Sequence, residues 1–212
     1  MPTCDSSPSA LRIAYILAGG KSSRFGSSKA LVQIGGMPQI LRLARQLQAD
    51  SWQSVAISQT AGEFESLGIR TIGDIEKDCG PVAGVLSGLL DLHNTSQASQ
   101  PQGSLVCPYA LFVTCDLWEW NPCWSGMLIS QNTGSQIGPG LLNYFQADSF
   151  LPFPCSIHVD ALPQVQDAWR LGARSMRSLL KALESVSRTI VAAEGQIPAS
   201  FNTHEDLSRL QR

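Results

Sequence analysis

A glycine-rich loop with three cations constrains this chain more than any other feature. The loop reads Leu17-Ala-Gly-Gly-Lys-Ser-Ser-Arg-Phe-Gly-Ser-Ser-Lys29, and it lies between an apolar run at 11–17 and an amphipathic helical pattern that starts at Pro38. Glycine leaves backbone N–H groups uncovered and lets a ligand approach closely. Glycines and cations after a strand favour a polyanion, of which a nucleoside triphosphate is the commonest. The alternative is a glycine-rich turn with solvated lysines.

The bulk composition indicates a single globular domain. The chain has 212 residues, of which 43% are hydrophobic and 15% are charged, enough to bury a full core. We expect a flexible tail at 1–10 and one domain at 11–212. The net charge of −2 argues against a nucleic-acid partner, because a general nucleic-acid binder would be basic.

Targeting signals and metal-binding cysteine patterns are missing from the sequence. No apolar run reaches the ~18 residues of a membrane span, and the first ten residues lack a basic segment followed by an apolar core. We therefore expect a cytoplasmic protein with no membrane partner. The six cysteines form no C-x-x-C pair and have no histidine at metal-ligand spacing. Cys115 and Cys155 are expected to be buried free thiols.

Short apolar runs alternate with helical patterns along the chain. We predict strands at 12–17, 54–58, 69–72, 109–115 and 188–192. Helices are predicted at 38–49 and 61–67, with further helices beginning near Gly80, Asp160, Ser175 and Thr203. The polar stretch 94–104 is expected to be a surface loop, and 131–157 contains only pieces that resemble strands. This alternation favours an α/β domain with a largely parallel sheet.

Several polar residues fall where predicted parallel strands end. Leu17, Ser58, Asp74 and Asp116 all close such strands, and ligands collect at the carboxyl ends of strands in open α/β sheets. We expect these four residues on one rim of the sheet. Asp116 is a lone carboxylate there, as suits Mg²⁺ bound to phosphates. Asp74 and Asp116 could instead be helix caps, and Ser58 could simply end a strand.

Three glycines repeat at a spacing of four residues in the next helical pattern. Gly80, Gly84 and Gly88 would lie on one helix face, which allows either a backbone or a ligand to come close. Packing against the sheet is at least as plausible for Gly88. For Gly80-Pro81, at the start of the helix, a ligand is favoured.

The loop at 17–29 resembles a known signature. It has neither G-x-G-x-x-G nor G-x-x-x-x-G-K-[ST], but its pattern L-A-G-G-x-S-x-R-x-G-x-x-K is similar to that of nucleotidyltransferases with a nucleotide-diphospho-sugar transferase fold. Within that group it most resembles the molybdenum cofactor guanylyltransferases. The resemblance implies a three-layer, Rossmann-like domain that transfers GMP from GTP to the phosphate of molybdopterin-bound molybdenum and releases pyrophosphate.

The resemblance also implies roles for individual residues. Residues that match the nucleotide-binding positions of the family are Leu17, Ala18, Gly19, Gly20, Lys29, Ser58, Asp74, Gly80, Pro81 and Asp116. Arg24 and Lys29 would stabilise phosphate charge, Asp74 would contact guanine, and Asp116 would bind Mg²⁺. Ser58 stands where the family often has an asparagine that faces the base. The closing Phe201-Asn-Thr-His-Glu-Asp-Leu207 is similar to the family's N-T-P-E-D-L.

Departures from the family pattern keep alternatives open. Asp116 is followed by Leu117-Trp118 where the family usually has proline two residues on, and 131–152 matches poorly. A related enzyme that uses CTP or another phosphate acceptor is the nearest alternative, and a non-catalytic nucleotide-binding protein is a further one. Proteins that deliver or accept the cofactor are plausible partners. The tryptophans after Asp116 are expected to pack in the core rather than stack on a pterin.

Overall fold

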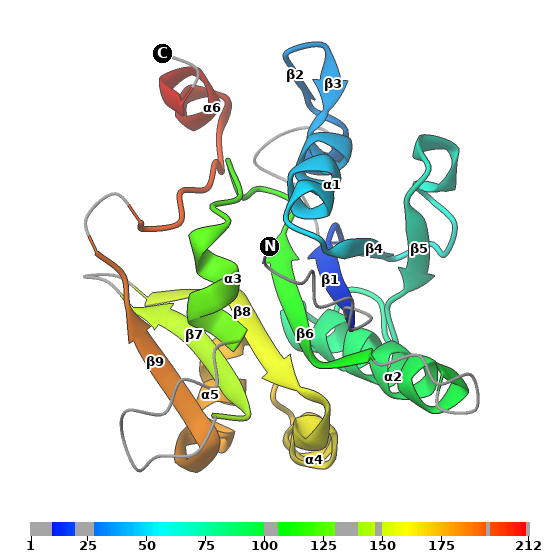
Figure 1. Ribbon diagram of the computed structural model, residues 1–212, viewed down its shortest axis with the longest axis vertical. Coiled ribbons are helices and arrows are strands. Elements are labelled where there is room, and N and C mark those ends of the chain that lie inside the picture. Colours follow the sequence, from blue (N-terminus) through cyan, green and yellow to red (C-terminus); the bar gives the residue numbers. More distant parts are fainter. Residues whose placement is uncertain are drawn as a thin grey trace, which may run out of the picture.

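A computed structural model describes residues 10–19, 28–99, 106–129, 140–146, 150–193 and 196–210. Its centre is a seven-stranded sheet in the order β5-β4-β1-β6-β8-β7-β9 (Figure 1). The strands are β1 (Leu11–Leu17), β4 (Gln53–Ser58), β5 (Arg70–Gly73), β6 (Val106–Thr114), β7 (Leu142–Gln146), β8 (Phe150–His158) and β9 (Ser187–Val191). A separate hairpin pairs β2 (Gln33–Ile34) with β3 (Met37–Pro38).

The sheet is mostly parallel, as the sequence predicts. β1 pairs in parallel with both β4 and β6, β4 with β5, and β7 with β9. β8 pairs antiparallel with β6 and with β7, so within the described sheet it alone runs against the other strands. The chain is therefore an α/β domain in which the first four strands of the sheet share one direction.

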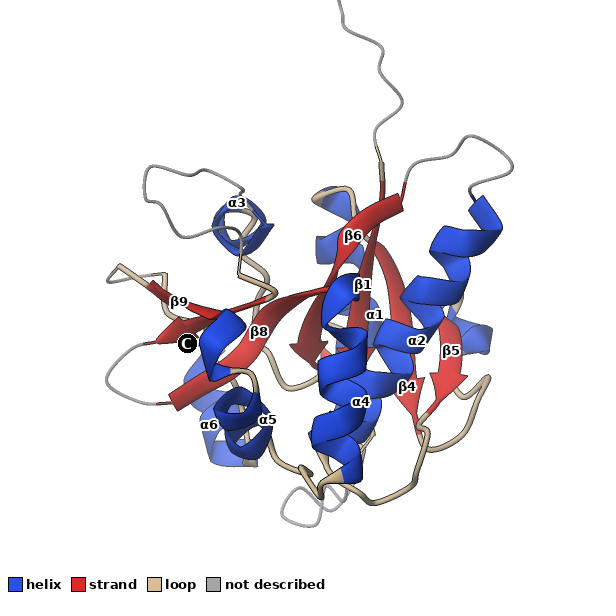
Figure 2. Cartoon of the chain, turned by 90° about the horizontal axis from the view of Figure 1, so that it is seen from below, coloured by secondary structure: helices blue, strands red, loops and turns tan. Residues whose placement is uncertain are grey.

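Helices cover both faces of the sheet and make three layers. The described helices are α1 (Gln39–Ala49), α2 (Pro81–Ser99), α3 (Cys123–Ile129), α4 (Leu162–Arg170), α5 (Met176–Ala182) and α6 (His204–Leu210). The α2, α4 and α5 helices lie together over one face, and α4 packs on both α2 and α5 (Figure 2). α1 and α3 belong to the core on the other face.

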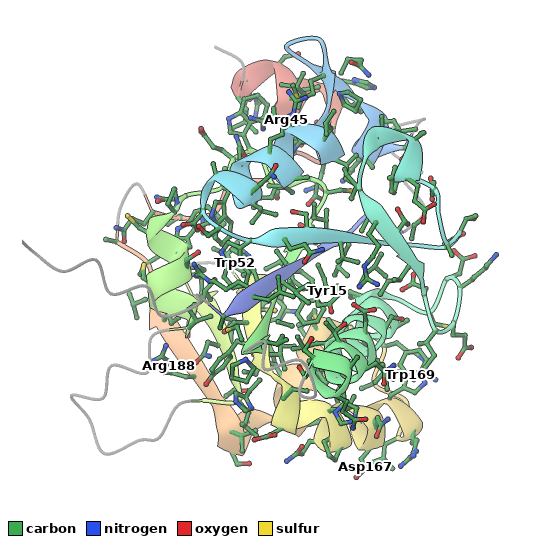
Figure 3. All side chains as sticks on the ribbon, turned by 45° about the vertical axis from the view of Figure 1, so that its right-hand side comes forward. Tyr15, Arg45, Trp52, Asp167, Trp169 and Arg188 are labelled. Atoms are coloured by element: carbon green, nitrogen blue, oxygen red, sulfur yellow. The ribbon has the colours of Figure 1, made fainter. Side chains whose placement is uncertain are left out.

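The central strand β1 shows how alternation builds both layers. Its odd-numbered residues from Ile13 pack with α2 and α4, whereas Ala14 and Ile16 pack with α1, because successive side chains of a strand point to opposite faces. Figure 3 shows Tyr15 and Trp52 in the interior. Their polar atoms are satisfied, since the Tyr15 hydroxyl donates to Asp91 and the Trp52 indole donates to Ser125.

Some element predictions need correction. α2 continues to Ser99, through residues 94–99 of the polar stretch predicted to be a loop, because an exposed helix face accepts polar residues. The predicted helix at 61–67 is a turn that ends in a 3-10 turn at Glu65–Leu67. Asp160 lies within a 3-10 turn, and Ala161 is the N-cap of α4. α3 and most of β8 are elements that the sequence pattern did not predict.

Other local predictions are confirmed. Cys115 and Cys155 are buried free thiols. Thr203 caps α6, because its hydroxyl accepts from the backbone N–H of Asp206 at 3.1 Å. The predicted tail at 1–10 lies, apart from Ala10, outside the described residues. Within the part of the chain that is described, the helices are too short or too polar to cross a membrane.

Candidate functional site

The carboxyl ends of the four parallel strands meet on one rim, as predicted. Leu17 pairs with Ile57 of β4 and with Thr114 of β6, and Ser58 pairs with Gly73 at the end of β5. Backbone hydrogen bonds continue beyond the strands, since Ala18 and Gly19 both donate to the Ile57 carbonyl, at 2.9 and 3.2 Å. The loops that follow these strands are therefore fixed side by side where they begin.

A cavity of about 490 Å³ opens at this rim, within the volume range of small-molecule sites. It is lined by Leu17, Ala18, Gly19, Lys29, Ile57, Gln59, Asp74, Asp78, Cys79, Gly80, Pro81, Gly84, Thr114, Cys115, Asp116 and Asn202. The wall thus combines backbone from the end of β1, one lysine, three carboxylates and two primary amides. Such a polar, charged lining suits a ligand with both phosphates and a hydrogen-bonding ring.

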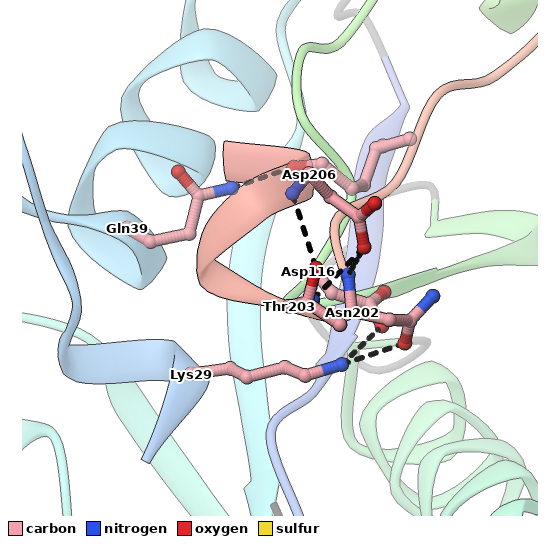
Figure 4. A network of polar contacts seen from close by, with 7 residues as sticks. Lys29, Gln39, Asp116, Asn202, Thr203 and Asp206 are labelled. Carbon is pink, nitrogen blue, oxygen red and sulfur yellow. Dashed lines mark hydrogen bonds and ion pairs between the residues drawn. The ribbon is translucent and has the colours of Figure 1, made fainter. Parts of the chain in front are cut away.

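Lys29 and Asp116 form an ion pair on the cavity wall. The Lys29 Nζ lies 3.1 Å from Asp116 Oδ2 and 2.8 Å from Asn202 Oδ1 (Figure 4). The Lys29 side chain is only 14% exposed and that of Asp116 only 21%, so water screens this pair less than a surface pair. Three distant segments of the chain thus converge on one cation.

The chain near the C-terminus is tied down around Asp116. Phe201 donates its backbone N–H to the Asp116 carbonyl at 3.0 Å, and Trp118 donates to Ala199 at 2.8 Å. The Asp206 carboxylate accepts from the backbone N–H groups of Asn202 and Thr203 (Figure 4), and the first of these bonds holds the Asp206 pKa below its usual value. These contacts fix Asn202 beside Lys29.

The opposite side of Asp116 is held by a buried glutamine. Gln39, at the start of α1, is fully buried and donates its Nε2–H to the Leu117 carbonyl at 2.6 Å (Figure 4). Its Oε1 accepts from the Arg42 side chain at 2.9 Å. Because buried polar groups are costly unless paired, this arrangement anchors the turn after β6 to α1.

Asp74 is the unsatisfied polar group of the cavity. Its Oδ1 is buried and has no hydrogen-bond partner among the described residues. Burial raises the pKa of the Asp74 carboxyl to about 6, because desolvation disfavours the charged form. Its backbone N–H donates to the Ser58 carbonyl at 2.8 Å, which fixes the loop after β5. A buried, orphaned acceptor on a cavity wall is suited to a ligand that brings N–H donors.

Two glycines, Gly19 and Gly84, leave room for the Asp74 carboxylate. A Cβ at Gly19 would lie 3.0 Å from Asp74 Oδ2, and one at Gly84 would lie 3.2 Å from Oδ1 and 2.8 Å from Leu17 Cδ2. Gly80 has a φ of +83°, and a Cβ there would lie 2.4 Å from the Arg174 carbonyl oxygen. Glycine at position 84 thus leaves room for the Asp74 and Leu17 side chains at the cavity wall. Glycine at position 80 allows both the left-handed backbone conformation and the close approach of the Arg174 carbonyl.

Gly88, at the end of the same glycine series, serves packing alone. A Cβ there would lie 2.6 Å from Phe112 Cε1 and 3.0 Å from Tyr15 Cγ, so α2 sits close against the sheet. Gly88 is outside the cavity lining, which among the described residues includes Gly80 and Gly84. Gly88 therefore allows close packing of α2 on the sheet, whereas Gly80 and Gly84, on the same predicted helix face, line the cavity.

Gln59 lines the cavity where Ser58 was expected to do so. Ser58 is 2% exposed and its hydroxyl donates to Glu63, so it does not face the cavity. The next residue, Gln59, lines the cavity, and its Nε2 donates to Asp78 Oδ1 at 2.8 Å. The one-residue offset reflects the alternation of side chains at the end of a strand.

The remaining predicted site residues divide into two groups. Leu17, Ala18, Gly19 and Pro81 line the cavity, whereas Gly20 and Arg24 lie outside the described residues. The buried tryptophans pack in the core as predicted: Trp120 and Trp124 are 4% and 3% exposed, and their indole N–H groups donate to Asp50 and to the Gln196 carbonyl.

Sequence reasoning missed several residues of the cavity wall. Asn202 lies in the closing F-N-T motif, so its motif was visible although its contact with Lys29 was not. Gln59 and Asp78 gave no signal, because a polar residue in a loop is ordinarily solvated. Cys115 also lines the wall, and burial raises the pKa of its thiol to about 12. It is therefore a neutral thiol at pH 7, not a nucleophile.

Comparison with known proteins shows the family of this chain. Residues 14–188 match the family described as the MobA-like NTP transferase domain. The chain belongs to this family. Among curated relatives, the molybdenum cofactor guanylyltransferase of Xanthomonas euvesicatoria is 26% identical, over 92% of each chain. A Thermococcus sibiricus relative is 40% identical over 81 residues, which cover 36% of this chain and 41% of that protein.

A solved structure supports the fold of this MobA-like domain. Molybdopterin-guanine dinucleotide biosynthesis protein A from Archaeoglobus fulgidus superposes with a TM-score of 0.68 at 17% identity, covering 94% of this chain and 96% of that one. The segment that matches the family, residues 14–188, begins within β1 and ends within β9, so it contains Lys29, Asp74 and Asp116. Asn202 and α6 lie beyond it.

Proposed function

We propose that this protein transfers GMP from GTP to the phosphate of molybdopterin-bound molybdenum and releases pyrophosphate. The observation that carries the proposal is one cavity that holds both the Lys29–Asp116 pair, which suits phosphates, and the orphaned Asp74 carboxylate, which suits a base with N–H donors. The names of relatives such as the Xanthomonas enzyme state the same activity. The product would be the guanine dinucleotide form of the cofactor.

The reaction needs charge stabilisation more than acid–base catalysis. An oxygen of the acceptor phosphate forms a bond to the α-phosphorus of GTP, and the bond from that phosphorus to the bridging oxygen breaks, so pyrophosphate leaves with the electron pair. The attacking oxygen is already anionic at pH 7, so no general base is required. Lys29 would stabilise the phosphate charge, and Asn202 and Asp116 would hold its ammonium in place.

Asp116 fits a Mg²⁺ ligand in this proposal. It is a partly buried carboxylate on an open cavity wall, and the described residues contain no cluster of three or more metal-binding side chains. Mg²⁺ is commonly held by one or two carboxylates together with phosphate oxygens and waters, so one carboxylate suffices. When bound, Mg²⁺ neutralises charge on the phosphates.

Guanine selection would fall to Asp74. Guanine presents the N1–H and the 2-amino group side by side, and an ionised carboxylate can accept from both. Adenine lacks both donors at those positions, so it would leave the buried Oδ1 unpaired, which is costly. Two resemblances to guanylyl relatives favour GTP over the CTP alternative, namely L-A-G-G in the loop, where cytidylyl relatives typically have L-A-A-G, and Gly80-Pro-Val-Ala-Gly84.

A thermal-shift panel tests the nucleotide specificity. The protein is melted with GTP, CTP, ATP or UTP, each with and without Mg²⁺. A ligand at a hundred times its Kd adds about 2.7 kcal/mol of stability, so we expect a clear Mg²⁺-dependent shift with GTP alone. A shift with CTP alone would transfer the assignment to the cytidylyl alternative. Absence of any shift would contradict a nucleotide site in this cavity.

A further inference from the structure

After β4, the residue that lines the cavity near Asp74 is Gln59, which carries an amide, and not Ser58, which carries a hydroxyl. Ser58 is buried and bonded to Glu63, whereas Gln59 lines the same cavity as Asp74 and Asp78. Gly19 lies close to both Asp74 and Gln59, because a Cβ there would be 3.0 Å from Asp74 Oδ2 and 3.9 Å from the Gln59 backbone nitrogen. Gln59 and Asp74 therefore flank one small region of the cavity.

Asp78 holds the Gln59 amide in position. Gln59 Nε2 donates to Asp78 Oδ1 at 2.8 Å, so the bond joins the loop after β4 to the loop after β5. A primary amide carries two N–H groups, and this bond uses one of them. Asp78 has a φ of +58°, a left-handed conformation that aspartate, asparagine and glycine tolerate. The Asp78 carboxylate thus contacts Gln59 from a loop whose backbone conformation suits aspartate.

If Asp74 accepts from guanine N1–H, the neighbouring O6 acceptor of guanine needs a hydrogen-bond donor close to Asp74. Guanine places the O6 acceptor next to N1–H, and an ionised Asp74 carboxylate can only accept. Among the described lining side chains, the other nitrogen donors are Lys29 and Asn202, and Lys29 is bonded to both Asp116 and Asn202. Gln59 is the nitrogen donor whose loop adjoins Asp74, and its second N–H remains for a ligand.

We propose that Gln59 is a further specificity-determining residue, which donates its second N–H to guanine O6, and that Asp78 is its positioning residue. This inference rests on the proposed function and deepens it. In this arrangement the base is recognised from two sides: Asp74 accepts from the N1–H and the 2-amino group, and Gln59 donates to O6. Adenine, with a 6-amino donor in place of O6, meets a donor at Gln59 and an acceptor without a partner at Asp74.

Calorimetric binding of GTP and of 6-thioguanosine triphosphate tests Gln59 directly. Both nucleotides carry the N1–H and the 2-amino group, but sulfur at position 6 accepts hydrogen bonds poorly. With Mg²⁺ and no acceptor, we expect the unmodified protein to bind GTP about 3- to 10-fold more tightly, the effect of one hydrogen bond. Gln59→Ala should bind the two nucleotides equally, whereas the control Gln53→Ala, at an exposed position of the same strand, should keep the preference. A preference unchanged in Gln59→Ala would overturn the inference.

Two substitutions test the role of Asp78. Asp78→Gly removes the carboxylate without straining the left-handed backbone, and it should lower the preference for GTP over the thio analogue. Asp78→Asn keeps an oxygen that can accept from Gln59 and should retain most of that preference. If the glycine variant keeps the preference, or if the asparagine variant loses it as fully as the glycine variant, Asp78 does not position Gln59.

The outcomes separate this inference from the proposed function. If the unmodified protein binds neither nucleotide, both the inference and the proposed function fail. If it binds GTP far more tightly than ATP but distinguishes GTP and its thio analogue equally well with and without Gln59, only the inference fails. Asp74→Ala is the companion variant, because it should weaken both guanine nucleotides together and leave their ratio in place.

Discussion

Lys29 is held by two acceptors that come from distant parts of the sequence. Asp116 follows β6 and Asn202 precedes α6, yet both lie within 3.1 Å of the same ammonium nitrogen. A lysine side chain has four rotatable bonds, so fixing it costs conformational entropy. The two hydrogen bonds place the Lys29 charge before a ligand arrives. Preorganised charge of this kind is the main contribution that a protein makes to phosphoryl-type transfer.

Removal of the Lys29 ammonium should therefore slow transfer far more than it weakens folding. We expect Lys29→Ala to lower kcat by about 10²- to 10³-fold, the usual effect of removing one donor that stabilises the transition state. Steady-state pyrophosphate release measures this. Lys181→Ala, at an exposed position of α5, is the matched control and should keep full activity. A loss of less than threefold in Lys29→Ala would remove this lysine from the mechanism.

The proposed role of Asp74 predicts a guanine preference that depends on pH. The pKa of the Asp74 carboxyl is raised to about 6 by burial, and in the proposed complex guanine would require the ionised carboxylate as an acceptor. As the pH falls through 6, the carboxyl gains a proton, so GTP affinity should fall by up to tenfold per pH unit. The GTP-to-ATP affinity ratio from pH 5 to 8 is the readout, because both nucleotides carry phosphates that titrate alike.

The control for this pH dependence is Asp74→Asn, which cannot ionise. In that variant the GTP-to-ATP ratio should be low and flat across the same range. A ratio in the unmodified protein that is equally flat, with GTP still preferred at pH 5, would contradict the role of Asp74 as the ionised acceptor for guanine.

At the scale of elements, α2 connects packing to the site through its glycines. Gly88 touches the sheet and Gly84 touches Asp74 and Leu17, so the same helix face fixes the sheet contact and the cavity wall. We expect Gly88→Ala to lower the free energy of unfolding by about 1 to 3 kcal/mol, because the added methyl overpacks Phe112. Urea unfolding measures this loss.

Gly88→Ala should leave the GTP-to-ATP binding ratio unchanged, because Gly88 is outside the cavity lining. Gly84→Ala is the informative comparison, since its methyl would crowd Asp74 Oδ1 at 3.2 Å and should reduce that ratio as well as stability. Equal loss of nucleotide preference in both variants would show that the helix acts on the site only through global stability.

Predictability from the sequence differs among the elements. β1, β4 and β5 follow short apolar runs, and α1 follows a regular 3.6-residue pattern, so their positions were predicted to within a residue or two. The end of α2 and the whole of α3 were not, because polar residues on an exposed helix and a mixed stretch such as Cys123–Ile129 carry no clear period. Gly80, Gly84 and Gly88 were identified as one face, and the structure decides between the two alternatives left open for Gly88 in favour of packing against the sheet.

At the scale of the whole molecule, sheet order decides which residues meet. β5, β4, β1 and β6 are neighbours in space, so the residues after four separate strands share one rim. The sequence predicted this gathering from the general rule for α/β sheets. It did not predict the contact of Asn202 with Lys29, because that contact joins residues 173 positions apart, and no local pattern specifies such a pairing.

The most direct measurement of the central claim is transfer of the labelled α-phosphate of GTP to the acceptor. The full chain is incubated with GTP labelled at the α-phosphorus, Mg²⁺ and molybdopterin-bound molybdenum, and the product is identified by mass and by label. We predict one GMP joined to the acceptor and one pyrophosphate released per turnover, with Asp116→Asn slower by at least two orders of magnitude. Transfer that proceeds equally well from CTP, or no labelled product despite GTP binding, would contradict guanylyl transfer by this protein.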